Sequence, residues 1–129
     1  MYIFEKVYFI YIKNEYYFLF LIMFDWYTIK YLFPNAFNKF AEVMFPNVGI
    51  ESISTLEYFD IKKLYHFFDK EGIFLTVEMY TKDDWDYCIS LSNGISFSGA
   101  KERKRNREDI EYDGFCECFR FLEKKIKES

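Results

Sequence analysis

The spacing of apolar residues changes once along this chain, at Gly72, and this change restricts the possible folds more than any other feature. Before Gly72, apolar residues recur three and four positions apart, the spacing of helices. After it they alternate, in the order Ile73, Leu75, Val77 and Met79. We therefore expect a strand over residues 73–80 with its odd positions facing a core. A second alternating run over residues 85–91 predicts a neighbouring, half-buried strand.

The next connection contains Asn93-Gly94, a frequent sign of a two-residue hairpin loop. Such a loop would place Ile95 opposite Ser92 and turn the following apolar side chains to the polar face. A three-residue loop, with Gly94 left-handed in a bulge, keeps them on the apolar face. We predict this loop, with the pairs Leu91 opposite Ile95 and Ile89 opposite Phe97.

Capping residues and apolar stripes predict the helices. Asp25 is a suitable N-cap for a helix that runs through Leu32, and Pro34 suits the first position of a helix over residues 34–45. Asp60 and Asn106 are suitable N-caps for two further helices, the first ending at Gly72. The expected inward residues are Phe37, Phe40, Ala41 and Met44, then Ile61, Leu64, Tyr65 and Phe68, and finally Phe115, Cys118, Phe119, Leu122 and Ile126.

Gly114 stands in the middle of the last predicted helix, where glycine costs about 1 kcal/mol relative to alanine. We expect another element to pack closely against it. The order of elements predicts an α+β fold in a two-layer arrangement, with N-terminal helices, a three-stranded antiparallel meander and a long C-terminal helix.

Residues 1–22 differ in composition from the rest of the chain. Sixteen of the 22 are Phe, Tyr, Ile, Lys or Asn, and none is Gly, Pro, Ser, Thr or Asp. They suit a strand pair with Lys13-Asn14-Glu15 as its turn, or they are translated upstream sequence and Met23 is the true start. Both interpretations stay open. The 129 residues suffice for one core, so we expect residues 23–129 to form a single α+β domain after an extension over residues 1–22.

Cysteine usage and the apolar runs bear on the compartment. The chain has three cysteines, an odd number, and Cys116 and Cys118 are spaced unlike a usual structural bridge, which favours the reducing cytoplasm. The longest uncharged apolar run covers residues 16–24, whereas a membrane-spanning helix needs roughly 20 residues. We expect no membrane span and no secretory signal. An aromatic N-terminus that rests on a membrane surface stays open.

Two segments carry a family resemblance. Residues 60–73, followed by a strand, Trp85 and Arg107-Glu108-Asp109 at the start of a Phe-rich helix, resemble small proteins from phages and prophages of Bacteroidetes-type bacteria. Residues 28–37 resemble the opening segment of these proteins. The resemblance covers residues 23–127 and implies a mobile element in an A/T-rich genome, without implying an activity. Residues 1–22 have no counterpart in it, which favours Met23 as the start.

The motifs of common enzymes and metal sites are missing from the sequence. His66 is the only histidine, and its aromatic neighbours favour a helix-surface position beside a core. Two helix residues two positions apart point about 200° from each other, so Cys116 and Cys118 do not converge on zinc; we expect Cys118 in the core and Cys116 partly exposed. The acids at 83–86 suit a turn, and those at 108–117 suit a helix N-terminus. We predict no catalytic residue, no cofactor, no metal and no enzymatic activity.

Five basic residues precede or open the last helix: Lys101, Arg103, Lys104, Arg105 and Arg107. They would bind phosphates while Tyr80, Trp85 or Tyr87 stack on a base, which defines a nucleic-acid-binding accessory protein. The net charge of −4 and the pI near 5.1 count against this alternative. Aromatic residues anchor protein interfaces and make up 24% of the chain, so we favour a protein-binding module or adaptor with a protein partner, as in a phage-encoded host modulator. The oligomeric state stays open.

Overall fold

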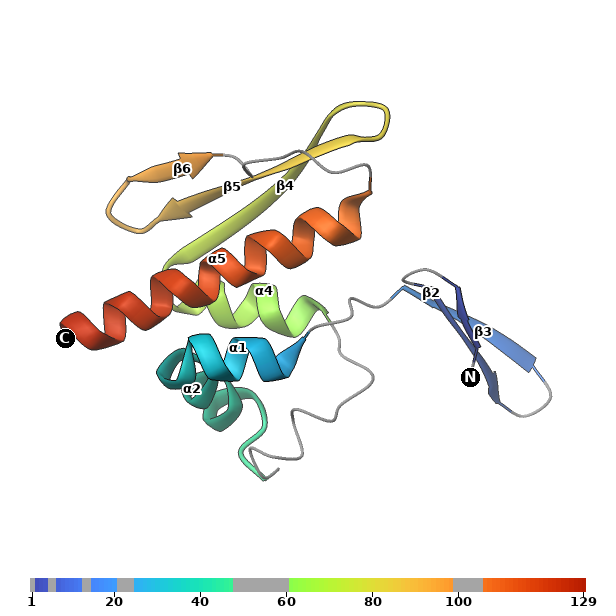
Figure 1. Cartoon of the computed structure of the whole chain (residues 1–129), viewed down its shortest axis with the longest axis horizontal. Helices are drawn as coiled ribbons and strands as arrows, with labels where there is room; N and C mark the ends of the chain where they lie inside the picture. The colour runs from blue at the N-terminus through green and yellow to red at the C-terminus, as the bar shows by residue number, and fades with distance from the viewer. Residues whose placement is uncertain (1, 5–6, 13–14, 21–24, 48–60, 99–105) are drawn as a thin grey trace.

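The computed structural model of the chain describes residues 2–4, 7–12, 15–20, 25–47, 61–98 and 106–129 (Figure 1). Its elements are β1 (Tyr2–Phe4), β2 (Val7–Ile12), β3 (Glu15–Phe20), α1 (Trp26–Leu32), α2 (Pro34–Met44), α4 (Ile61–Lys70), β4 (Ile73–Thr81), β5 (Asp84–Leu91), β6 (Ser96–Ser98) and α5 (Arg107–Glu128). The sheet of β4, β5 and β6 lies on one side and the helices on the other, which confirms the α+β class. Several predicted features lie outside the described residues: the turn positions 13–14, Met23, the cap Asp60 and the basic residues 101–105.

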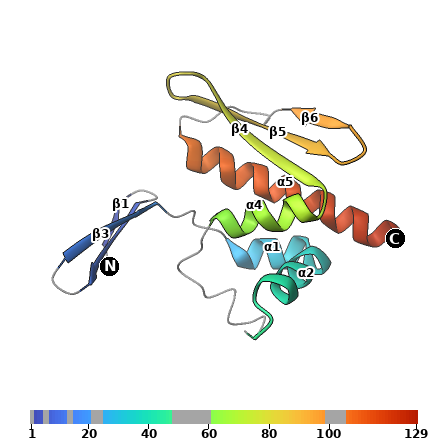
Figure 2. The same cartoon turned by 180° about the vertical axis from the view of Figure 1, so that it is seen from behind.

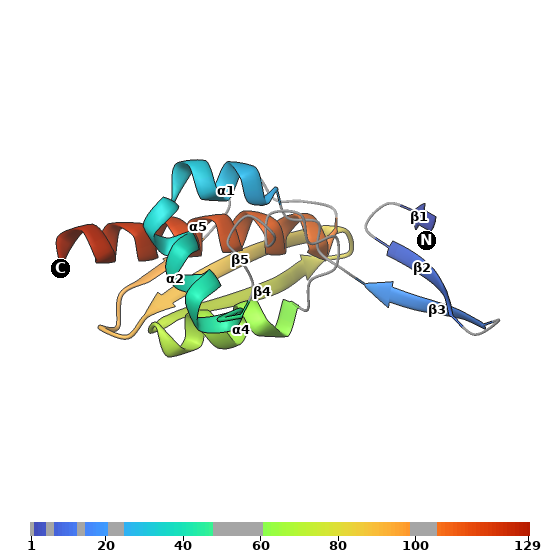
Figure 3. The ribbon, with the colours of Figure 1, turned by 90° about the horizontal axis from the view of Figure 1, so that it is seen from below.

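The first two helices begin as their capping residues predict. The Asp25 carboxylate accepts hydrogen bonds from the Thr28 backbone N–H at 3.1 Å and from its hydroxyl at 2.6 Å, and these bonds lower the pKa of Asp25. α1 ends before Phe33, and Pro34 follows as the first residue of α2. The two helices therefore meet at a sharp corner, visible in Figure 3.

α5 lies between the sheet and the first two helices. It contacts β4 and β5 on one side and α2 on the other (Figures 1 and 3). Its N-cap is Asn106, whose side-chain oxygen accepts the Asp109 backbone N–H at 3.1 Å. The predicted inward residues Phe115, Cys118, Phe119 and Leu122 are buried, and Ile126 is partly buried. A long helix with apolar contacts on two sides thus organises the core.

Aromatic rings fill the space between the helices. Trp26 stacks on Phe40 with ring centroids 5.5 Å apart, and the edge of Phe119 meets Phe40 at 5.9 Å. Phe68 continues the cluster toward the sheet side, 4.9 Å from Phe119. Such tilted and offset contacts are the arrangements that aromatic pairs favour. α1, α2, α4 and α5 are consequently joined through one aromatic cluster.

The register of the β4–β5–β6 meander agrees with the sequence prediction. Ile89 pairs with Phe97, and the Leu91 N–H donates to the Ile95 carbonyl at 2.8 Å. The loop contains three residues and ends at Gly94, whose φ of 90° is left-handed. The prediction of a three-residue bulged loop is therefore confirmed.

One burial prediction was wrong, and another was incomplete. Met79 is 56% exposed although it shares the odd positions of β4 with the buried Ile73 and Leu75, because the β4–β5 turn stands away from α5 (Figures 1 and 2). In α4 the fully buried residues are Leu64, Phe67 and Phe68, while Ile61 and Tyr65 are only partly buried. Phe67 is buried because its ring meets Phe40 of α2 at 5.2 Å. Phe67 is therefore buried although it is not one of the residues that the spacing predicted to face inward.

Residues 2–20 contain a second antiparallel sheet of order β1–β2–β3. β2 and β3 form the strand pair that the sequence suggested, and β1 adds a third, short strand. Glu15 pairs with Ile12 and belongs to β3 rather than to the predicted turn. None of the helices in the described ranges is long and apolar enough to cross a membrane.

Candidate functional site

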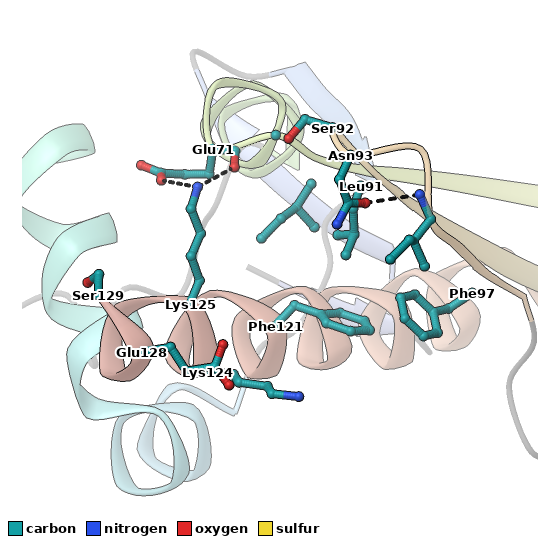
Figure 4. Close-up of a pocket in the computed structure, with 13 residues that line it drawn as sticks. Glu71, Leu91, Ser92, Asn93, Phe97, Phe121, Lys124, Lys125, Glu128 and Ser129 are labelled. Atoms are coloured by element: carbon teal, nitrogen blue, oxygen red, sulfur yellow. Dashed lines mark hydrogen bonds and ion pairs between the residues drawn. The ribbon is translucent and has the colours of Figure 1, made fainter.

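A hollow of about 500 Å³ opens between the C-terminal half of α5 and the end of the sheet where β4 begins (Figure 4). We call it the α5–sheet groove. Its apolar side chains are Ile73, Leu91, Ile95, Phe97 and Phe121. Its polar border is formed by Glu71, Ser92, Asn93, Lys124, Lys125 and Glu128. An apolar hollow with a few polar groups at its border is typical of a binding site.

Two aromatic rings line the groove. Phe97 of β6 and Phe121 of α5 lie 4.8 Å apart between ring centroids, and their planes are tilted by 37°. The Arg120 guanidinium stands 4.9 Å from the centroid of Phe121, a cation–π arrangement that restrains this ring. Phe97 is nonetheless 45% exposed and Ile95 is 50% exposed. The groove therefore presents apolar surface that the described part of the chain leaves accessible.

Hydrogen bonds hold the border of the groove in place. The Ser92 N–H donates to the Gly72 carbonyl at 3.0 Å, and Asn93 Oδ1 accepts the Ile95 N–H at 3.0 Å. Lys125 Nζ donates to the Glu71 carbonyl at 2.9 Å, as Figure 4 shows. The α4–β4 connection, the β5–β6 loop and α5 are thus tied together around the hollow, which favours a preformed site.

A second, smaller hollow of about 400 Å³ lies beside α5 next to the end of α1. We call it the α1–α5 hollow. Its apolar residues are Leu32, which is 53% exposed, and Phe33. Lys124 and Glu128 border both hollows, and Lys127 borders the second. Two apolar surfaces therefore flank one charged ridge of α5.

Two lysines of this ridge take part in no ion pair with a described residue. Among the described residues, neither Lys124 nor Lys127 has a carboxylate within 4.0 Å. The neighbouring Arg120 does, because its guanidinium contacts Glu117 at 2.6 Å, and this contact raises the pKa of Arg120.

Of the five basic residues predicted to contact nucleic acid, the structure describes only Arg107. Lys101, Arg103, Lys104 and Arg105 lie outside the described residues. Arg107 is the first residue of α5, and its Nε stands 3.2 Å from Glu111 Oε1. Its guanidinium is therefore already engaged by a carboxylate of its own helix.

The three predicted surface aromatics differ in their surroundings. Trp85 pairs with Met79 and Tyr87 with Val77, and Tyr87 is partly buried against the core. Tyr80 is the extra residue of a β-bulge and is 53% exposed. Burial raises the pKa of Tyr87 to about 12, and the carboxylates of Glu117 and Asp113 add to this rise. Two carboxylates of α5 therefore act on Tyr87.

The positions of His66, Cys116 and Cys118 agree with the sequence predictions. His66 is exposed on α4, Cys118 is buried in the core, and Cys116 is partly buried. Burial raises the pKa of the Cys116 thiol to about 11. Within the described ranges, no three His, Cys, Asp or Glu side chains lie together as a metal site would require.

Two buried carboxylates of α5 hold other elements in place. Glu123 accepts the backbone N–H groups of Asn35 at 3.2 Å and Ala36 at 2.8 Å, and so caps the N-terminus of α2. Glu111 accepts the Tyr65 hydroxyl at 2.7 Å, and burial raises the pKa of this carboxylate. Both acids bind groups within the fold, which explains why they tolerate burial.

No family model, curated protein or solved structure matches the chain.

The sequence interpretation missed the two hollows and their charges. No sequence motif marked the basic residues of the last turns of α5 as part of a site. The spacing of two acids did indicate the buried carboxylates of α5. Glu111 lies four positions before Phe115, and Glu123 lies four positions after Phe119. This spacing places both acids on the inward side of the helix. Acids at buried positions of a helix indicate specific polar partners.

Proposed function

We propose that this chain is a small non-enzymatic protein-binding module that acts in the cytoplasm. The observation that carries the proposal is the α5–sheet groove, in which Ile95 and Phe97 remain about half exposed beside Phe121. Partly exposed aromatic residues in a preformed hollow are typical anchors of protein interfaces. The resemblance to phage and prophage proteins supports the more specific role of a phage-encoded modulator of a host protein.

The alternative, a nucleic-acid accessory protein, has weaker support in the described residues. Arg107 is paired with Glu111, and the carboxylates of Glu117 and Asp113 near Tyr87 would repel a phosphate backbone. The net charge of −4 acts in the same direction. We therefore favour a protein partner.

Affinity capture from cells of the native host tests the proposal, with and without nuclease treatment. The tagged chain is compared with Phe97→Ser, which removes a ring from the groove. Phe74→Ser is the matched control, because Phe74 is a 41% exposed aromatic residue of the same sheet that alternates with the buried Ile73 and Leu75. We expect a nuclease-resistant partner that binds the unmodified chain and Phe74→Ser but does not bind Phe97→Ser.

Recovery of nuclease-sensitive material alone would contradict the proposal and favour the nucleic-acid alternative. Equal recovery by Phe97→Ser would show that the groove is not the contact surface.

A further inference from the structure

We propose that the partner segment recognised by the α5–sheet groove is an acidic peptide with two apolar anchors. One aromatic or large aliphatic side chain occupies the α5–sheet groove, and a second apolar side chain occupies the α1–α5 hollow. A carboxylate between them binds Lys124 and Lys127. This inference rests on the proposed function and specifies its partner.

The charge on α5 indicates that the partner segment is negatively charged. Lys124 and Lys127 are exposed, lie three positions apart and therefore project from the same side of the helix. Within the described part of the chain neither has an acidic partner. The opposing charges nearby are mostly engaged, because Glu123 caps α2 and Glu117 pairs with Arg120. Glu128 and the terminal carboxylate of Ser129 are the exceptions. Against them stand Lys124, Lys127 and also Lys125, because Glu71 beside Lys125 already pairs with Lys39 at 2.9 Å, so the ridge keeps a positive excess.

The positions of the hollows indicate how apolar and acidic residues follow one another in the partner segment. Lys124 borders both hollows, so a segment that crosses α5 at this residue reaches apolar surface on each side. Phe97 and Phe121 give the larger hollow an aromatic lining, whereas Leu32 and Phe33 line the smaller one. A segment of the form apolar–acidic–apolar therefore matches the surface in both shape and charge.

Selection from a displayed library of short random peptides tests this inference on the full chain. We expect enriched sequences to carry one or more acidic residues between two apolar ones. In fluorescence anisotropy with a synthetic selected peptide, Phe97→Ser should weaken binding about tenfold or more, while Phe74→Ser leaves it unchanged. Where Phe97→Ser fails to fold cooperatively in thermal unfolding, Ile95→Ser takes its place.

A charge exchange isolates the ridge. The double substitution Lys124→Glu with Lys127→Glu should weaken the acidic peptide about tenfold, and a peptide whose acids are replaced by lysine should regain that affinity on the double variant. Lys82→Glu is the matched control, because Lys82 is an exposed lysine at the β4–β5 turn. It should leave both peptides unaffected.

The outcomes separate the inference from the proposed function. Selected peptides that need Phe97 but lack acids and ignore the charge exchange would overturn the inference and leave the protein-binding function standing. Enrichment of no peptide, or of peptides that bind Phe97→Ser as tightly as the unmodified chain, would overturn the proposed function itself. Binding of a duplex DNA probe that the double lysine substitution abolishes would replace the peptide with a nucleic acid.

Discussion

Gly114 of α5 lies against Leu75 of β4 so closely that a Cβ at position 114 would stand 2.6 Å from Leu75 Cδ1 and 3.1 Å from Cδ2. Both residues are buried. The close approach predicted for a glycine in mid-helix is thus observed. It sets the spacing between α5 and the sheet, and so the position of the α5–sheet groove further along the same helix.

We expect Gly114→Ala to destabilise the protein by about 1 kcal/mol. Overpacking a core costs about 1–3 kcal/mol, and alanine recovers up to about 1 kcal/mol in helix propensity. Urea unfolding measures the change in free energy. Leu75→Val, which shortens the facing side chain, should reduce the cost of Gly114→Ala in a double-mutant cycle. Additive effects would show that the close approach of these two residues is not the cause.

Glu123→Ala should destabilise the protein by about 1–3 kcal/mol, because buried N–H groups at the start of α2 lose their acceptor. The N-cap residue of α2, Phe33, has no side-chain oxygen to replace it. Glu128→Ala is the matched control on the exposed side of the same helix, and its effect should stay within about 0.5 kcal/mol. Equal thermal unfolding curves for the two variants would contradict the capping role.

Strand register and helix caps were predicted correctly because they depend on residues that are close in the sequence. The register of β5 and β6 was predictable because a slip by one residue would turn Ile95 and Phe97 to the polar face. The caps at Asp25 and Asn106 were also predictable, because each side chain accepts a hydrogen bond from an N–H only three residues away.

Contacts between distant segments were beyond such patterns. Phe67 is buried by Phe40, which lies 27 positions earlier, and Glu123 is held by an α2 terminus 87 positions away. The α5–sheet groove joins the end of α4, the β5–β6 loop and the last turns of α5. Its assembly depends on how these three segments meet, and the period of a single segment carries no information on that.

The thiol of Cys116 should react slowly at neutral pH. Its pKa is raised to about 11, and only the thiolate is nucleophilic, so about one thiol in a thousand is reactive at pH 8. In a Cys88→Ser chain, the rate of disulfide exchange with an aromatic disulfide reagent should rise about tenfold per pH unit below the pKa. Adding Cys116→Ser should abolish this phase, because Cys118 is fully buried. Rapid, pH-independent labelling would contradict the raised pKa.

A chain that begins at Met23 should fold cooperatively. The described core is drawn from residues 26–126, and its caps and strand pairs belong to the same part of the chain. Thermal unfolding by circular dichroism and size-exclusion chromatography measure the outcome. A product that lacks a cooperative transition would show that residues 1–22 contribute to the core.

Replacement of Arg103, Lys104 and Arg105 by serine tests the nucleic-acid alternative. We expect no binding of DNA or RNA at near-physiological salt before or after the change, and a change in stability of at most about 1 kcal/mol. If these residues bind phosphates, the dependence of log affinity on log salt will instead flatten by about 0.7–0.9 for each phosphate that is no longer neutralised. A micromolar affinity that collapses in the triple variant would support nucleic-acid binding.

The placement of α5 between two groups of elements has a consequence for how the molecule opens. Because α5 contacts the sheet on one side and α2 on the other, its displacement exposes the buried surfaces of both at once. The backbone amides of α2 and of β4 should therefore exchange with solvent deuterium at the same free energy of opening, as one cooperative unit. A ligand that clamps α5 should slow exchange on both sides of it, including amides far from the ligand.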